Sequence, residues 1–257
     1  TGASSGIQFG KSMDMDSTGT IWAIGDSYNT NVGSVRVYKY QNAAWSQMGS
    51  TINGSNSEDQ FGGDVSISGD GNVLVIGALA GSFFTSSGTR VYGYVSTYHY
   101  VNGDWVLFGE PSGYNANVSI VPTTNHTSST YWGTLISTNN DGTVVVIGEM
   151  NDSSKGGIWR YDSSSDSWNN EHIFSHRTSD VAMSRDGTRV VTGNQGDNTN
   201  GNHSGAIRVY NYSSSTQSWS QIGSTLTGSE TYDRIGYKVA ISGDGNTLFQ
   251  CASNESS

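Results

Sequence analysis

Carboxylates recur beside glycine along the chain, in short polar runs that could bind a metal ion. The run Ser-Gly-Asp-Gly-Asn at 68–72 is one example, and related runs contain Gly19, Gly142, Gly187 and Gly245. Calcium takes six to eight oxygen ligands, whereas most of these runs offer a single carboxylate. A tight turn, in which Asp bonds to its local backbone and Gly adopts positive φ, needs no ion. The runs therefore predict structural turns, and we assign no metal, cofactor or catalytic residue to them.

Glycoside hydrolysis is the other chemistry that such carboxylates suggest, and it needs two of them held across a cleft. Several carboxylates lie outside the turns, and nothing in the sequence pairs them; they include Glu58, Asp59, Glu110, Glu149 and Asp233. The run at 242–249 resembles a sialidase Asp-box but lacks the residue between Asp and Gly. We expect a non-enzymatic protein, with a secreted glycoside hydrolase as the weaker alternative.

Tryptophan and arginine recur at fixed places and could bind a glycan or a carboxylate. The tryptophans of successive repeats are Trp45, Trp105, Trp168 and Trp219, and the arginines that stand two residues before a tyrosine are Arg36, Arg90 and Arg208. A lectin would use such tryptophans for stacking on sugars. Packing between neighbouring sheets is the favoured interpretation of both sets, with guanidinium groups lying along tyrosine rings, because structural roles recur in every repeat.

The elements that carry these residues are predicted to be strands. Val (20) and Ile (15) far outnumber Leu (6), and no window shows apolar residues at helical spacing over three turns. Val, Ile and aromatic residues favour strands. The chain is therefore expected to be all-β, with a core assembled from many short strands.

A four-part unit repeats along the chain. Each copy has a hairpin with the polar turn, a third strand opened by glycine and a fourth strand that carries tryptophan. The turn glycines lie 52, 71, 45 and 58 residues apart, slightly above the ~40 to 50 residues of a four-stranded propeller blade. The longest interval contains a predicted polar loop insertion at 110–130. The sequence predicts one β-propeller domain with four complete repeats and the first half of a fifth, forming part of a longer propeller. The expected repeats are 7–58, 59–128, 129–177, 178–232 and 233–257.

The repeated motifs resemble the FG-GAP repeat of integrin-α-like propellers. The shared features are a Phe-Gly pair that opens the unit (Phe9-Gly10, Phe61-Gly62), an Asp-Gly hairpin, an Ile-Gly strand end and a Gly-x-Val-Arg-Val-Tyr strand. The third unit has Trp132-Gly133 instead, and the fourth lacks the pair. The resemblance implies a seven-bladed propeller that acts in adhesion or ligand binding at cell surfaces. The hairpins also resemble those of WD40 and TolB-type propellers.

The charge balance narrows the range of partners. The chain has 12 basic and 22 acidic residues and a net charge of -10, so it offers no basic stripe for nucleic acid. No apolar run approaches the ~20 residues that span a bilayer, and no signal peptide is recognised. The single cysteine, Cys251, excludes an internal disulfide.

A composition low in Lys and rich in Ser, Thr, Asn and Gly fits an extracellular protein, whereas the number of sequons is close to that expected by chance. N-x-[ST] triplets, which mark glycosylation sites in secreted proteins, begin at Asn53, Asn117, Asn125, Asn151, Asn202, Asn211 and Asn254. We expect a secreted or cell-surface glycoprotein that acts as a binding, adhesion or structural module on a cell surface, filament or secreted assembly. Its partner is expected to be a protein, a glycan or another chain of an assembly. A lectin-like propeller that binds glycans through the repeated aromatic residues is the alternative.

Overall fold

The computed structural model describes residues 9–27, 32–56, 59–84, 90–110, 118–121, 132–150 and 156–253. These residues form 19 strands and no helix. The all-β prediction is therefore confirmed for the part of the chain that the structure describes.

The strands form five antiparallel sheets, numbered here in chain order. Sheet 1 contains β1 (Ser12–Met15), β2 (Ile21–Asp26), β3 (Ser34–Gln41), β4 (Ala44–Gln47) and β5 (Ile52–Asn53). Sheet 2 contains β6 (Phe61–Ile67), β7 (Val73–Phe84), β8 (Arg90–Val101) and β9 (Asp104–Phe108). Sheet 3 contains β10 (Leu135–Thr138), β11 (Val144–Gly148), β12 (Gly157–Asp162) and β13 (Ser167–Ile173). Sheet 4 contains β14 (Asp180–Met183), β15 (Arg189–Asn194), β16 (Ala206–Ser213) and β17 (Ser218–Thr227), and sheet 5 contains β18 (Lys238–Ile241) and β19 (Leu248–Cys251).

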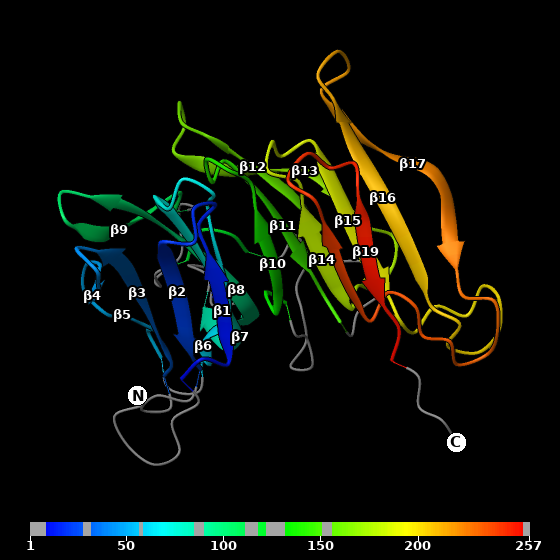
Figure 1. The fold of residues 1–257 in the computed structure, drawn as a ribbon, viewed down its shortest axis with the longest axis horizontal. Coiled ribbons are helices and arrows are strands. Elements are labelled where there is room, and N and C mark those ends of the chain that lie inside the picture. Colours follow the sequence, from blue (N-terminus) through cyan, green and yellow to red (C-terminus); the bar gives the residue numbers. More distant parts are fainter. Residues whose placement is uncertain are drawn as a thin grey trace.

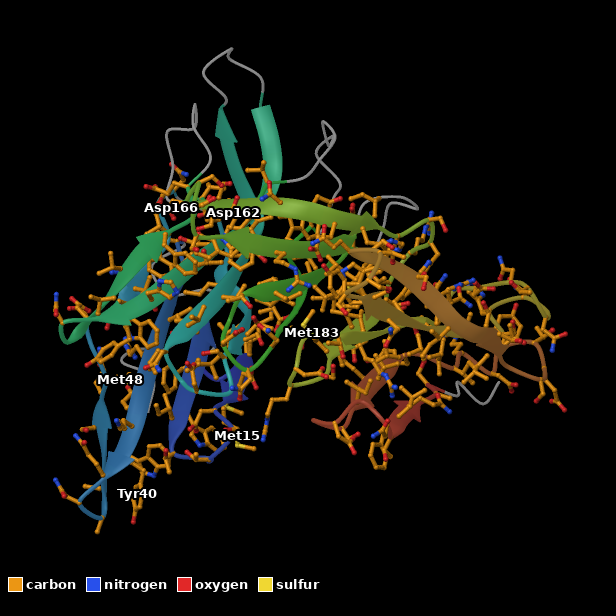
Figure 2. All side chains as sticks on the ribbon, turned by 90° about the horizontal axis from the view of Figure 1, so that it is seen from above. Met15, Tyr40, Met48, Asp162, Asp166 and Met183 are labelled. Atoms are coloured by element: carbon orange, nitrogen blue, oxygen red, sulfur yellow. The ribbon has the colours of Figure 1, made fainter. Side chains whose placement is uncertain are left out.

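The sheets stand next to one another in chain order, and the first strand of each sheet lies beside the first strand of the next. Figure 1 shows this succession, from sheet 1 at the left to the long strands of sheet 4 at the right. Figure 2 shows the arc from above, with Met15 of β1 and Met183 of β14 on its concave side and Tyr40 near its outer edge. The first strands therefore line the inside of the arc.

The second strands of sheets 2, 3 and 4 are buried on both faces over most of their length. In β11, Val144 is 1 % exposed and the three residues after it are fully buried. Val144 and Val146 pack toward sheet 4, whereas Val145 and Ile147 pack toward sheet 2. A strand between two neighbouring sheets needs apolar side chains on both faces, which explains its unbroken apolar sequence. The core consists of these layers between the sheets.

Glycines at the ends of the second strands allow the sheets to approach closely. A Cβ atom added to Gly77 would lie 1.9 Å from the carbonyl oxygen of Gly133, and one added to Gly25 would lie 2.2 Å from that of Gly62. Gly62 and Gly133 belong to the Phe-Gly and Trp-Gly pairs that open the next unit. The two glycine motifs of the repeat therefore meet across the interface between sheets.

The Asp-Gly runs form hydrogen-bonded turns that also join the sheets. In the turn of sheet 2, Ser68 Oγ donates to Asp70, and Asp70 accepts the backbone N–H of Asn72 at 3.0 Å. The N–H of Asp70 donates to the carbonyl oxygen of Asn140 in the turn of sheet 3 at 3.0 Å, and the N–H of Asn140 donates to Arg185 O in the next turn at 2.7 Å. These contacts give the carboxylates and the backbone of the turns a structural role. We call the face that carries these turns the turn face.

The loops that lead into the first and third strands lie on the opposite face, which we call the loop face. This follows from the antiparallel order of the strands, because every first and third strand begins there. The predicted polar insertion at 110–130 falls mostly outside the described residues.

Candidate functional site

The repeated tryptophans lie mainly between sheets. Trp105 is 8 % exposed, and its Nε1 donates to the carbonyl oxygen of Met48 in sheet 1 at 2.9 Å. Trp168 is partly buried, and its Nε1 donates to Thr97 Oγ1 in sheet 2 at 3.1 Å. Trp219 is 6 % exposed. Trp45 differs, because it is 50 % exposed and no sheet precedes it in the described part of the chain. The geometry therefore provides an accessible aromatic site at one of the four positions.

The three arginines named from the sequence are not equivalent, which corrects their expected alignment. Arg36 stands opposite Ile24 in the strand ladder, and Arg208 stands opposite Thr192 in the same way. Arg90 pairs with Phe84 at the far end of the longer β7–β8 hairpin. The Arg-Val-Tyr tripeptide of sheet 2 therefore lies nearer the start of its third strand than the tripeptides of sheets 1 and 4 do.

The described arginines also make different contacts. The guanidinium group of Arg36 lies 5.4 Å from the ring centroid of Phe9, whereas Arg208 forms an ion pair with Asp197 at 2.9 Å. The stacking of arginine on tyrosine between sheets occurs at Arg160, whose guanidinium group lies 4.5 Å from the ring centroid of Tyr212. Sequence reasoning missed Arg160 because it adjoins a tyrosine instead of preceding one by two residues.

The other named residues occupy separate places. Asp59 accepts hydrogen bonds from Tyr94 Oη at 2.7 Å and from the N–H of Asn56. Asp233 accepts the N–H groups of Ser229 and Glu230 in its own loop. Glu110 is exposed and Glu149 is buried, whereas Glu58 lies outside the described residues. The described carboxylates Asp59 and Asp233 thus hold loops together.

Three of the seven sequon asparagines belong to the described residues. Asn53 and Asn202 are exposed, and Asn211 is partly buried with its Nδ2 donating to the carbonyl oxygen of Tyr212. Asn202 Nδ2 donates to Tyr232 Oη at 2.9 Å. The others, Asn117, Asn125, Asn151 and Asn254, lie outside the described residues.

Acidic side chains line a polar hollow of about 510 Å³ between the first strands of the five sheets. Asp14 accepts the N–H of Ile67 at 2.9 Å, and Asp64 accepts that of Ile136 at 2.8 Å. Asp180 makes the same kind of bond to sheet 5. Each carboxylate therefore joins the first strand of its own sheet to the first strand of the next, and this gives the three carboxylates a structural explanation.

Asp64 predicts a pH dependence of stability. Burial raises the pKa of Asp64 to about 7, so the carboxyl group keeps its proton in the folded protein at pH values where it is ionised in the unfolded chain. Its stabilising contribution is complete below the unfolded pKa near 4 and is lost as the pH rises to about 7. We expect the free energy of unfolding, relative to an Asp64→Asn variant, to fall by about 4 kcal/mol over this range. Urea denaturation at a series of pH values measures this difference, and a difference that rises with pH would contradict the assignment.

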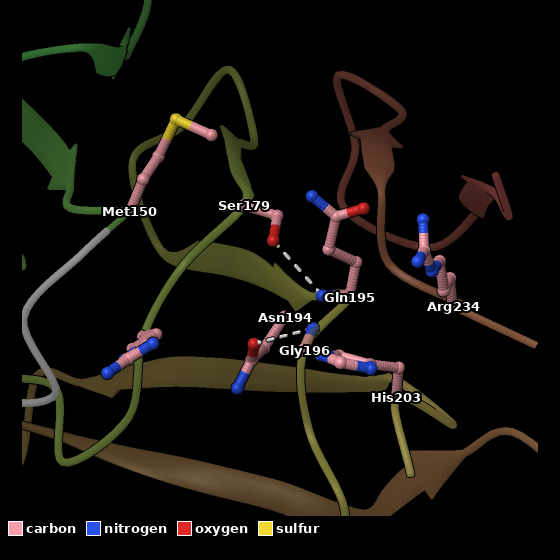
Figure 3. A pocket seen from close by; sticks show the side chains of 8 residues that line it. Met150, Ser179, Asn194, Gln195, Gly196, His203 and Arg234 are labelled. Atoms are coloured by element: carbon pink, nitrogen blue, oxygen red, sulfur yellow. Dashed lines mark hydrogen bonds between the residues drawn. The ribbon is translucent and has the colours of Figure 1, made fainter. Parts of the chain in front are cut away.

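A second hollow opens where loops of sheets 3, 4 and 5 meet on the loop face, and we call it the arginine hollow. It has a volume of about 310 Å³ and is lined by Met150, Arg177, Ser179, Asn194, Gln195, Gly196, His203 and Arg234. Figure 3 shows Met150 and Arg234 on opposite sides of it. Met150 follows β11, Arg177 and Ser179 precede β14, and Arg234 precedes β18. The hollow therefore depends on the stacking of neighbouring sheets.

Backbone contacts fix the shape of the arginine hollow. The N–H of Gln195 donates to Ser179 Oγ at 3.0 Å, and the N–H of Gly196 donates to Asn194 Oδ1 at 3.1 Å, as drawn in Figure 3. The N–H of Arg234 donates to the carbonyl oxygen of His203 at 3.0 Å. These bonds hold the loops before and after sheet 4 in one arrangement.

Two residues of the arginine hollow adopt left-handed backbone conformations. His203 has φ of 52° and Arg234 has φ of 50°, values that cost of order 1 kcal/mol or more in residues other than glycine. The ring of His203 stacks on Tyr232 with centroids 5.8 Å apart. Such strain persists where the surroundings hold it, and it is concentrated at functional sites.

The chemistry of the arginine hollow suits an anion. Two guanidinium groups and an imidazole line it, and among the described residues its lining includes no Asp or Glu. Guanidinium binds carboxylate or phosphate through paired hydrogen bonds. Arg177 is exposed and forms no ion pair with a carboxylate of the described residues. Sequence reasoning missed these residues because they lie in loops outside the repeated motifs.

Two features of the described residues concern metal ions and membranes. No group of three or more His, Cys, Asp and Glu side chains in them could hold a metal ion. None of their elements is a helix long and apolar enough to cross a membrane.

Comparisons with known proteins identify the fold. No protein-family model matches the sequence, and no curated protein matches it. A functionally unknown protein from Desulfotomaculum acetoxidans superposes with a TM-score of 0.56 at 15% identity, over 94% of this chain and 64% of that one. A provisionally assigned 6-phosphogluconolactonase from Bacteroides fragilis gives 0.55 at 9% identity, over 93% and 56%. The Dos1 propeller gives 0.52 at 14% identity, over 93% and 51%.

These likenesses define the class of the protein as a β-propeller fold. Antiparallel sheets of four strands that succeed one another along an arc, with their first strands on its inside, are typical of such a fold. The chain spans between about half and two thirds of the length of the structures it matches.

Proposed function

We propose that the protein is a non-enzymatic binding propeller that holds an acidic group of its partner in the arginine hollow. One observation carries the proposal: Arg177, His203 and Arg234 line one hollow, and the described residues of its lining include no Asp or Glu. The chain as a whole carries 22 acidic and 12 basic residues, so a cationic hollow stands out against its surface. A carboxylate is the group that matches these donors in size and charge.

Binding is favoured over hydrolysis by the kind of residues in the hollow. A glycoside hydrolase needs two carboxylates that face one substrate. Ser179 Oγ, the hydroxyl of the lining, accepts a backbone N–H from Gln195. Guanidinium groups and amides instead provide donors for recognition.

The wider setting follows from the repeats. We propose that the chain is an FG-GAP-like part of a longer propeller and works outside the cell as an adhesion or structural module. The contact between the glycines of the Ile-Gly and Phe-Gly motifs supports the FG-GAP-like propeller, because it gives both motifs a role in stacking blades. The polar, lysine-poor composition and the exposed sequon residues Asn53 and Asn202 support the extracellular role.

The alternative of a glycan-binding protein has support at one aromatic position. Trp45 is half-exposed, and with Phe9, Trp22, Ile24 and Tyr38 it lines an apolar hollow of about 470 Å³. Such a surface could stack on a sugar ring. The other three tryptophans are engaged between sheets.

The test uses an acidic peptide rich in Asp and Glu and a matched peptide with Asn and Gln. We expect the acidic peptide alone to bind, with an affinity that falls as salt is added. Arg177→Gln should weaken binding by about tenfold, the value of a charge-assisted hydrogen bond. Isothermal titration calorimetry measures both effects.

Arg185→Gln is the matched control for this experiment. Arg185 is exposed like Arg177 but lies in the turn of sheet 4, on the opposite face. Its replacement removes the same charge and should leave binding within about twofold. Equal losses in the two variants would mean that net charge alone attracts the peptide, and the site assignment would then be wrong.

A further inference from the structure

At two interfaces between sheets, a pair of residues forms a seat for the tryptophan of the following sheet, whereas at the interface of sheets 3 and 4 Trp219 Nε1 donates to Glu171 Oε2 at 2.8 Å. In sheet 1 the seat is the pair Met48–Gly49: a Cβ atom added to Gly49 would lie 2.8 Å from Trp105 Cδ1, and Met48 is 6 % exposed under the indole. In sheet 2 the pair Phe108–Gly109 receives Trp168 with an equally close approach of 2.5 Å. We call this pair of an apolar residue and a glycine the tryptophan socket.

Sheet 4 carries the same socket at Ile222–Gly223. The sequence Gln-Met-Gly-Ser-Thr at 47–51 recurs as Gln-Ile-Gly-Ser-Thr at 221–225. Gln47 Nε2 donates to Gly49 O and Thr51 Oγ1, and the side chain of the second glutamine bonds to the corresponding atoms of its own turn. Gly223 has φ of 67°, and Gly49 has φ of 73°. The socket of sheet 4 therefore has the same backbone conformation and hydrogen bonds as the socket of sheet 1, although no tryptophan of the described residues covers it.

The socket of sheet 4 is uncovered. Ile222 is 42 % exposed, whereas Met48 is 6 % and Phe108 is 9 % exposed. A Cβ atom added to Gly223 would meet no atom within 4 Å. A hollow of about 280 Å³ lies here, between sheet 4 and the two strands of sheet 5. Its apolar lining residues are Val209, Ile222, Ile241 and Leu248.

The edge of sheet 5 lies beside this hollow. Among the described strands, β19 pairs with β18 alone, whereas β2, β7, β11 and β15 each pair with a third strand as well. A strand edge presents unpaired N–H and C=O groups that can accept another strand. A third and fourth strand added to β19 would bring a fourth-strand tryptophan over Ile222.

A second copy of the chain does not fit this place. The first two strands of the position are already filled by β18 and β19, so an intact sheet 1 from another copy cannot enter. A whole sheet is also hindered from stacking on the far side of sheet 5. In sheets 2 and 4 the second strand has a glycine, Gly77 or Gly193, at the position that contacts the next sheet. In sheet 5 the same position, paired with Lys238, is Cys251, which has a side chain. A Cβ atom added to either glycine would lie 1.9 or 2.2 Å from a carbonyl oxygen of the next sheet.

We propose that the tryptophan socket at Ile222–Gly223 and the edge of β19 together bind a β-hairpin of the chain's own third-and-fourth-strand type. The first strand of the hairpin pairs with β19, and the tryptophan of its second strand covers Ile222. Sheet 5 then has four strands like its neighbours, and the apolar hollow is closed. This surface lies apart from the arginine hollow, so the two sites are independent.

The test probe is a synthetic peptide with the sequence of residues 205–227, carrying 5-fluorotryptophan at the position of Trp219. We expect it to bind the full chain, seen as a shift of its fluorine NMR signal and of the Ile222 methyl signal. Its counterpart with alanine in place of tryptophan should bind at least about tenfold more weakly, because the buried indole provides most of the apolar contact.

Ile222→Lys and Val106→Lys are the matched protein variants. Val106 is 52 % exposed on β9 and Ile222 is 42 % exposed on β17, so both chains should fold. Ile222→Lys should abolish binding of the peptide, and Val106→Lys should retain it. The proposal is overturned by absence of binding at millimolar peptide, by equal binding of the alanine peptide, or by binding that survives Ile222→Lys.

Discussion

Replacing Gly77 by alanine should destabilise the protein by about 3 kcal/mol or more. The added methyl group would lie 1.9 Å from the carbonyl oxygen of Gly133, which is backbone and cannot rotate away. Sheets 2 and 3 would have to separate, and separation would weaken the contact of Val75 with the core on the other side. The effect arises from the contact and not from backbone strain, because Gly77 has no positive φ.

Gly243→Ala is the control for this substitution. Gly243 also lacks a positive φ, and the nearest atom to its added Cβ would be Arg185 Cβ at 3.6 Å, an ordinary van der Waals distance. Its replacement should leave stability unchanged or raise it slightly, because alanine restricts the unfolded chain. Urea denaturation followed by circular dichroism gives both values. A loss below about 1 kcal/mol for Gly77→Ala would show that the sheets are less closely stacked than the structure indicates.

The repeated part of the fold could be predicted because its signals are local. The Asp-Gly turn, the apolar second strand and the Gly-led third strand each follow one another within a few residues, so the five-fold recurrence is visible in the sequence. The function of the second-strand glycine could not be read in this way. Gly77 meets Gly133 only after sheets 2 and 3 are stacked, and no local pattern records that contact.

The arginine hollow could not be predicted for the same physical reason. Arg177, His203 and Arg234 come from three loops, and the stacking of sheets brings them together. Arg234 holds the place of Gln60 in a loop of equal length, so the repeat preserves the position but not the positive charge. The wrong alignment of Arg90 with Arg36 and Arg208 has a related cause. Strands β7 and β8 are 12 residues long, and this extra length places the Arg-Val-Tyr tripeptide of sheet 2 at a different position along its strand.

Trp105→Ala should cost about 3–5 kcal/mol, whereas Trp45→Ala should cost less than about 1 kcal/mol. The two residues hold the same position in consecutive repeats. Trp105 is 8 % exposed and lies against Gly49 of the preceding sheet, and Trp45 is 50 % exposed. Removing the first leaves a cavity between two sheets, and removing the second exposes a surface that is already in contact with water.

The comparison separates packing from ligand binding as the main role of the repeated tryptophans. Urea denaturation of the two variants measures the free energies of unfolding, and equal small losses would contradict packing at Trp105. Trp105→Phe adds a further step, because it keeps an aromatic ring but removes the N–H that donates to Met48 O at 2.9 Å. We expect an intermediate loss of about 1–3 kcal/mol, since the buried carbonyl oxygen loses its donor. An intermediate value would assign part of the stability to the hydrogen bond and the rest to the area that the indole buries.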